Sequence, residues 1–303
     1  MEQSVYHIPA LLKETIDGLN IKPDGTYVDV TFGGGGHSRA IIDNLSSNGS
    51  LLAFDQDIDA FRNAIEDKRF TFVHSNFRFL KNFLRFHGVT AVDGIVADLG
   101  VSFHHFDDEK RGFSFRFDGR LDMRMNKNAS ISAADILNNY SEQQIADILY
   151  LFGELKSARR IAAAIIKHRN AGGVFSSVQS LIDVVAKFIS PANQKKELAQ
   201  IFQAFRIEVN HEIDALHRLL VQANIVLKPG GRLCVLTYHS IEDRIVKNFF
   251  KSGNINGDIQ KDFFGKISTP FRLVNNKVIT PSDDEISANP RSISAKLRIA
   301  EKI

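Results

Sequence analysis

The chain has 303 residues, of which 44% are hydrophobic and 24% are charged. This is the composition of a globular protein with enough apolar material for a core, so a fibrous or disordered chain is excluded. No segment approaches the roughly 18–20 consecutive apolar residues of a membrane span, and the N-terminal residues lack a signal-peptide core. The single cysteine, Cys234, excludes an internal disulfide and a cysteine zinc site, and we expect a cytoplasmic protein.

Charge is informative only locally, because the net charge is just +3. Between Glu154 and Asp183 the chain has no acidic residue but several basic ones, namely Lys156, Arg159, Arg160, Lys167 and Arg169. This excess indicates either a surface for an anionic partner or a solvated helix face.

The first hundred residues alternate strand-like and helix-like segments. The predicted strands span residues 26–31, 51–55, 70–74 and 92–99, and the predicted helices span residues 37–45, 58–66 and 79–86. The strands are apolar on both faces, which is typical of a parallel sheet covered by helices on both sides. The sequence therefore predicts an α/β fold.

The pattern changes after the fourth strand. Residues 106–130 show no period and are predicted to be a loop, whereas residues 132–207 are helical in pattern, with capping candidates Ser132, Ser141 and Ser177. Apolar steps of three and four over residues 198–227 predict one long helix or two in register. A strand over 232–238, a helix over 242–250, a loop-rich stretch over 254–289 and a strand over 294–299 follow. We predict a discontinuous domain of residues 1–106 and 211–303, interrupted by a loop and helical domain of residues 107–210.

The glycines at positions 33–36 lie between a predicted strand and a predicted helix, where a ligand can approach the backbone and the helix N-terminus. Asp55 ends the next strand, twenty residues after Gly35, where a carboxylate can accept both hydroxyls of a ribose. Together these features predict a cofactor that contains a nucleoside. A dinucleotide and S-adenosylmethionine both fit, and Asp29 before the turn favours the methyl donor.

Asp98 ends the fourth predicted strand. Ligands of parallel α/β sheets bind beyond the carboxyl ends of the strands, so Asp98 should face the same cavity as Gly35 and Asp55. It can orient the nucleophile or hold the amino group of the donor, or it can simply cap the turn that follows.

Eight segments carry a resemblance that runs nearly end to end. They are residues 7–14 (HIPALLKE), 31–38 (TFGGGGHS), 98–102 (DLGVS), 111–115 (RGFSF), 121–125 (LDMRM), 202–210 (FQAFRIEVN), 239–247 (HSIEDRIVK) and 289–292 (NPRS). In this order they resemble the RsmH/MraW family of 16S ribosomal RNA cytosine-N4 methyltransferases.

The resemblance implies a class I, Rossmann-like methyltransferase sheet with an inserted helical domain for substrate recognition. It implies an enzyme that uses S-adenosylmethionine, without a metal, to methylate N4 of a cytidine in the decoding region of 16S rRNA, in the small ribosomal subunit. It also implies a monomer or homodimer. The donor-binding residues carried over are Gly35, Gly36, His37, Asp55, Phe77, Asp98 and His105.

Some of these positions depart from the family or have a second interpretation. His105 stands where the family has a glutamine, after a missing proline, and Thr31 stands where many methyltransferases have glycine. Phe77 can stack on adenine or belong to the core. His104 and His105 have no accompanying ligand cluster, so we expect no metal.

Catalysis needs acceptors for the hydrogens of cytosine N4, because its lone pair is delocalised into the ring. Asp98 is the first candidate, and Ser102 and His239 are the second. In the insert, Lys156, Arg160 and Lys167 share a predicted helix stripe that suits RNA phosphates or solvent. Gln203, Arg206 and Asn210 form another stripe, which either touches RNA or joins the domains.

Three other functions remain open from the sequence. A DNA or free-nucleotide amino-methyltransferase would use the same chemistry, and a nicotinamide dehydrogenase would bind NAD instead of the methyl donor. A non-catalytic RNA-binding factor would need neither the glycine turn nor Asp55.

Overall fold

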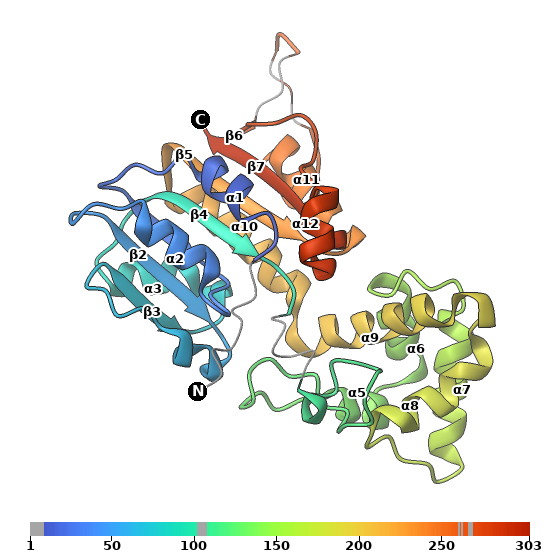
Figure 1. The fold of residues 1–303 in the computed structure, drawn as a ribbon. Helices are drawn as coiled ribbons and strands as arrows, with labels where there is room; N and C mark the ends of the chain where they lie inside the picture. Colours follow the sequence, from blue (N-terminus) through green and yellow to red (C-terminus); the bar gives the residue numbers. More distant parts are fainter. Residues whose placement is uncertain (1–8, 102–107, 260, 262, 266–268) are drawn as a thin grey trace. The chain divides into compact units, whose positions relative to one another are not determined.

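The computed structural model describes residues 9–101, 108–259, 261, 263–265 and 269–303. The chain divides into two compact units (Figure 1), a sheet unit of Met1–Gly100 and Ile213–Ile303 and a helical unit of Val101–Glu212. The domain boundaries expected from the sequence, 106/107 and 210/211, lie close to these. Within the described part of the chain, no helix is both long and apolar enough to span a membrane.

The sheet unit is built on seven strands in the order β3-β2-β1-β4-β5-β7-β6. The strands are β1 (Thr26–Asp29), β2 (Ser50–Asp55), β3 (Phe70–His74), β4 (Val92–Asp98), β5 (Leu227–Thr237), β6 (Phe271–Leu273) and β7 (Lys296–Lys302). Strands β1 to β5 pair in parallel, while β7 is antiparallel to both β5 and β6. The predicted α/β class and Rossmann-like sheet are confirmed.

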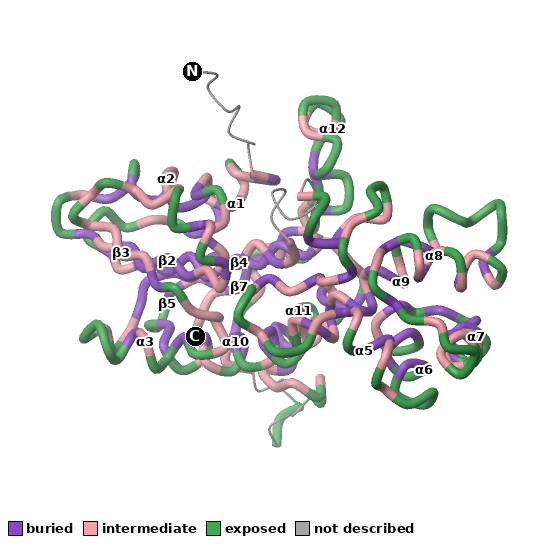
Figure 2. Tube along the Cα trace, turned by 90° about the horizontal axis from the view of Figure 1, so that it is seen from below, coloured by how far each residue is buried: buried purple, intermediate pink, exposed green. Residues whose placement is uncertain are grey.

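Helices cover both faces of this sheet, as its apolar strands require. On one face, α1 (Leu12–Leu19) and α2 (Gly36–Asp43) pack against Tyr27 and Val96. On the other, α3 (Leu80–Phe86), α10 (Glu212–Val226) and α11 (Ser240–Ser252) pack against Val28 and Ile95. The central strands are buried between the two layers (Figure 2).

The helical unit comprises α5 (Ala133–Asn139), α6 (Glu142–Leu151), α7 (Ala158–Asn170), α8 (Val178–Val185) and α9 (Gln194–Asn210), which bury their own apolar core. Ser132, Ser141 and Ser177 are N-caps with complete capping boxes, as predicted. The apolar period over residues 198–227 belongs to two helices, because His211 adopts a left-handed φ of 51° and ends α9.

Three short segments differ from the expectation. Residues 58–63 form a 3₁₀ helix, η1 (Ile58–Asn63), rather than the predicted α-helix. The stretch expected to be loop-rich contains β6, which pairs only with β7, and α12 (Asp283–Ala288), whose N-cap is Ser282. The remaining 3₁₀ turns are η2 (Phe77–Phe79), η3 (Glu109–Arg111), η4 (Ala186–Phe188), η5 (Pro191–Asn193) and η6 (Pro290–Ser294).

Candidate active site

Four adjacent strands bring polar side chains to one edge of the sheet. Asp29, Asp55 and Asp98 are the last residues of β1, β2 and β4, and Tyr238 directly follows β5. These strands are parallel neighbours, so their carboxyl ends meet at the same edge, where α/β sheets bind ligands. The structure therefore groups Asp55 and Asp98 as the sequence predicts, and it adds Tyr238.

Asp55 holds the glycine turn in place through a hydrogen bond. The Gly33 N–H donates to Asp55 Oδ2 and the Asp57 N–H donates to Oδ1, both at 2.8 Å. Burial raises the pKa of Asp55 to about 6 in spite of these two bonds. Each oxygen retains a lone pair, so the carboxylate can still accept hydrogen bonds from a ligand that lies along the turn.

The turn itself depends on one glycine in particular. Gly35 has a φ of +78°, and a Cβ placed on it would lie 2.3 Å from Arg39 Nη1 and 2.9 Å from the Phe32 ring. A Cβ on Gly36 would lie 2.7 Å from Pro9, whereas one on Gly34 would meet no described atom within 4 Å. The backbone at Gly34 is thus open to an approaching ligand.

The carboxylate of Asp29 is buried, and it accepts hydrogen bonds from within the chain rather than facing a ligand site. Its Oδ1 accepts the Thr31 N–H at 3.0 Å, and its Oδ2 accepts the Ser38 hydroxyl at 2.7 Å. Burial raises the pKa of its carboxyl group. Asp29 therefore connects β1, the glycine turn and α2.

Asp98 is held from two sides. Its N–H donates to Thr31 Oγ1 at 2.6 Å, and its Oδ1 accepts the Tyr238 hydroxyl at 2.6 Å. Burial raises the pKa of Asp98 to about 7, although the Tyr238 hydrogen bond lowers it. Thr31, which stands where glycine is common, thus has a role of its own, because its hydroxyl fixes the end of β4.

His37 contributes an unused polar atom to the same region. It is buried in the first turn of α2, with Nδ1 3.7 Å from Asp98 Oδ2. Its Nε2 is buried and has no hydrogen-bond partner among the described residues. Burial lowers the pKa of the imidazole, which favours the uncharged ring.

Phe77 begins η2, three residues after β3, at the same edge of the sheet. Its side chain is half-buried and packs against the core that includes Phe54 and Leu80. The structure thus gives Phe77 a core contact while leaving part of the ring accessible, so both interpretations of this residue stand.

His239 is the N-cap of α11. Its Nδ1 accepts the Glu242 N–H at 3.5 Å, and its Nε2 lies 3.1 Å from Glu242 Oε1. Within the described chain, no contact joins His239 to Asp98, whereas the neighbouring Tyr238 reaches it directly. Two further predicted site residues, Ser102 and His105, lie outside the described residues, as does His104.

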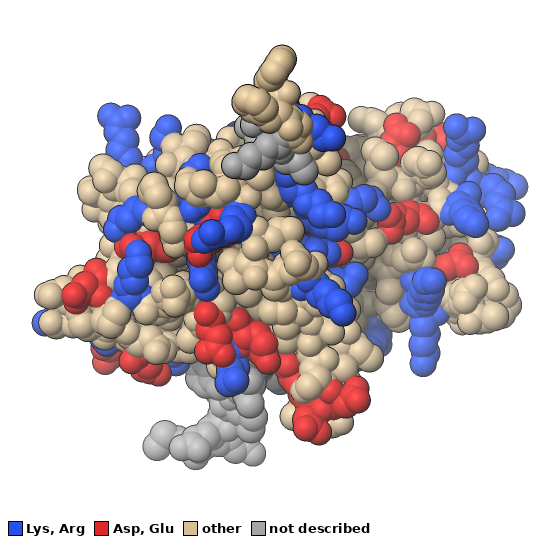
Figure 3. Space-filling model, turned by 90° about the horizontal axis from the view of Figure 1, so that it is seen from above, with Lys and Arg blue, Asp and Glu red and all other residues tan. Residues whose placement is uncertain are grey.

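The predicted stripe of Gln203, Arg206 and Asn210 lies on α9, but only part of the other stripe is helical, because Lys156 precedes α7, which begins at Ala158. Lys156, Arg160 and Lys167 are exposed, and Lys and Arg side chains gather at one end of the helical unit (Figure 3). Gln203 and Asn210 instead hold the unit together. Gln203 donates to the Phe152 carbonyl, and Asn210 donates to the Met123 carbonyl and accepts the Met125 N–H.

The model of the MraW methylase family matches residues 4–303. The chain belongs to this family. It is 60% identical over 301 residues to the ribosomal RNA small subunit methyltransferase H of Bacteroides fragilis, covering 99% of both chains.

A second relative and a solved structure are also similar to the chain. The chain is 54% identical to the Porphyromonas gingivalis protein of that name over 306 residues, covering all of this chain and 98% of the relative. Among solved structures, a putative rRNA methylase from Clostridium thermocellum is similar with a TM-score of 0.45 and 14% identity, covering 98% of this chain and 100% of that one. Family membership shows that the chain is a methyltransferase.

Proposed function

We propose that this MraW-family methylase transfers the methyl group of S-adenosylmethionine to N4 of a cytidine in the decoding region of 16S rRNA, in the assembled small subunit. One observation carries the donor assignment. The Gly33–Asp55 hydrogen bond, the open backbone at Gly34 and the unpartnered His37 Nε2 lie along a single glycine turn. The name shared by the relatives supports the ribosomal substrate.

The donor fits the chemistry of these residues. Bound S-adenosylmethionine supplies a methyl group on a positively charged sulfur, which is transferred by in-line displacement. Asp55 would accept hydrogen bonds from the ribose, and the backbone at Gly35, Gly36 and His37 would face the methionine part. Phe77 and His105 complete the proposed donor-binding set. The carboxylates favour a cation at this edge.

Asp98 has the properties of a proton acceptor. Its pKa of about 7 lies near physiological pH, where a general base is most effective, and Tyr238 holds one of its oxygens in place. We assign to Asp98 the role of accepting hydrogen bonds from the N4 hydrogens of the target cytosine or from the ammonium group of the donor. Ser102 and His239 are the second candidates for the role at N4. The target base must be splayed out, which costs a few kcal/mol.

The test is transfer of a tritiated methyl group onto small subunits from cells that lack the enzyme, followed by nucleoside analysis. We expect N4-methylated cytidine with the intact chain and at least 100-fold less with Asp55→Ala. Asp55→Asn keeps the size of the side chain, and Asp43→Asn, at an exposed position on α2, is the matched control.

Two results would contradict the proposal. Label on duplex DNA but not on subunits would indicate a DNA amino-methyltransferase. Tight binding of NAD without binding of S-adenosylmethionine would indicate a dehydrogenase. Melting curves of each variant separate loss of chemistry from loss of fold.

A further inference from the structure

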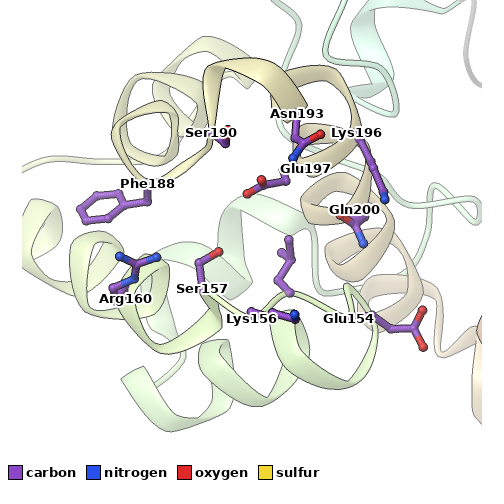
Figure 4. Close-up of a pocket in the computed structure, with 11 residues that line it drawn as sticks. Glu154, Lys156, Ser157, Arg160, Phe188, Ser190, Asn193, Lys196, Glu197 and Gln200 are labelled. Atoms are coloured by element: carbon purple, nitrogen blue, oxygen red, sulfur yellow. The ribbon is translucent and has the colours of Figure 1, made fainter.

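The helical unit contains a cavity of its own, away from the glycine turn in sequence. It has a volume of about 460 Å³ and is bordered by the N-terminal ends of α7 and α9 and by the η4–η5 segment (Figure 4). Sites for small organic ligands range from about 300 to 1,000 Å³, so this cavity has room for one nucleotide.

Two helices begin at this cavity without a side-chain cap. Ser157 is the N-cap of α7 and Asn193 the N-cap of α9, and neither side chain caps its helix. The positive end of the helix dipole makes such helix starts favourable for anions. By contrast, α5, α6 and α8 in the same unit are capped by serine side chains.

Ser157 lines the cavity with a polar side chain. This residue is only 8% exposed. Figure 4 shows this hydroxyl directed into the hollow, toward Glu197. A hydroxyl in this position can donate a hydrogen bond to a polar ligand in the cavity or accept one from it.

The charges around the cavity are mixed in a way that suits a nucleotide. Lys156, Arg160 and Lys196 are exposed on its rim, where they can reach phosphate. Glu197 is half-buried, with its carboxylate toward the interior, so a bare anion is disfavoured there (Figure 4). Carboxylates instead accept hydrogen bonds from the amino and imino groups of cytosine and guanine.

We propose that this cavity binds one unstacked nucleotide of the RNA substrate, other than the nucleotide that is methylated. The rim cations and the helix N-termini hold its phosphates, while Glu197, Gln200 and Ser157 contact the edge of a guanine or cytosine. Phe188, half-buried beside Arg160, offers a ring for stacking. This inference rests on the proposed RNA substrate and adds a second RNA contact to it.

The chain offers a closely matched pair of variants. Arg160→Gln/Lys196→Gln removes two cations that line the cavity, while Arg159→Gln/Lys195→Gln removes the neighbouring cations, which are exposed and do not line it. The probe is a set of fluorescein-labelled single-stranded RNA octamers, measured by anisotropy on the full chain at several salt concentrations.

We expect the cavity variant to bind RNA at least 10-fold more weakly and the control to change less than 3-fold. The slope of log affinity against log salt should fall by about 1.4 in the cavity variant, because each phosphate that a cation neutralises accounts for about 0.7 of this slope. Glu197→Gln should reduce the preference for guanine- and cytosine-containing octamers over uracil octamers by about 5-fold.

Equal RNA affinities for the two double variants would overturn the inference. Unchanged RNA affinity with weakened binding to assembled subunits would overturn it too, in favour of a ribosomal protein as the ligand. The proposed function is tested separately. If the intact chain methylates subunits and the double variants do so with equal KM, only the cavity inference fails, whereas no methylation by the intact chain contradicts the function itself.

Discussion

Burial and the Tyr238 hydrogen bond have opposite effects on the pKa of Asp98. The Tyr238 hydroxyl stabilises the ionised form, so its removal should raise the pKa of Asp98 further above about 7. We expect Tyr238→Phe to move the pH midpoint of S-adenosylmethionine binding upward by about 1 pH unit, equivalent to about 1.4 kcal/mol. The measurement is calorimetric titration between pH 5.5 and 8.5.

Tyr150→Phe is the control for this prediction, because Tyr150 is 66% exposed on α6. A midpoint that is identical in both variants would show that ionisation of Asp98 does not govern donor binding.

Asp98 also makes stability depend on pH. Its pKa is about 7 in the folded chain, against an ordinary value of 3.8. Between these values the folded state keeps a proton that the unfolded state releases, so the free energy of unfolding falls as pH rises through this window and stays lower above it. Asparagine does not titrate, so Asp98→Asn removes this decrease in the free energy of unfolding.

We therefore expect Asp98→Asn to increase the free energy of unfolding at pH 8 by about 1–3 kcal/mol while methyl transfer is lost. At pH 4 the variant and the parent should be equally stable. Urea unfolding at both pH values checks this, and equal stability of the two proteins at pH 8 would contradict it.

At the residue scale, the sequence predicts which polar side chains lie close together, but it does not predict their hydrogen-bond partners. Asp55 and Asp98 were predictable, because the ends of parallel strands share an edge. The contact between Tyr238 and Asp98 was not, because the direction of a hydroxyl depends on the side-chain rotamer and on packing. The position of Tyr238 after β5 was the available signal.

At the scale of elements, the glycine turn contains two adjacent glycines whose replacement by alanine should have different effects on stability. Gly35→Ala forces alanine into a φ of +78° and against Arg39 and Phe32, whereas Gly34→Ala meets no described atom. We expect Gly35→Ala to cost about 1–3 kcal/mol of stability and Gly34→Ala less than about 0.5 kcal/mol. Thermal melting of both variants checks this.

The Gly34 variant has a second readout. If the open backbone there is where the donor lies, Gly34→Ala should weaken S-adenosylmethionine binding without changing the melting temperature. Equal melting temperatures for both glycine variants would contradict the observed turn conformation.

Helix starts were predictable where serine caps an apolar repeat, as at Ser132, Ser141 and Ser177. The end of α9 was not, because apolar steps of three and four continue past His211, which ends the helix with a left-handed φ of 51°. Tertiary context also overrode local pattern at residues 58–66, where only a 3₁₀ turn forms.

At the scale of the whole molecule, the proposed donor site and the proposed nucleotide cavity belong to different compact units. Among the described residues, Asp55, Asp98, His37 and Tyr238 all belong to the sheet unit, while the helical unit buries a separate apolar core. Each activity should therefore respond to damage in its own unit.

Two leucine substitutions test this separation. Leu149 in α6 and Leu220 in α10 are both fully buried, one in each core. Leucine to alanine in a core costs about 2–5 kcal/mol. We expect Leu149→Ala to keep S-adenosylmethionine affinity within about 2-fold while methylation of subunits falls, and Leu220→Ala to weaken donor binding as well. Calorimetry and hydrogen exchange measure both, with faster exchange confined to the substituted unit. Equal loss of donor affinity in the two variants would mean that the units unfold together, and donor binding could then not be assigned to the sheet unit alone.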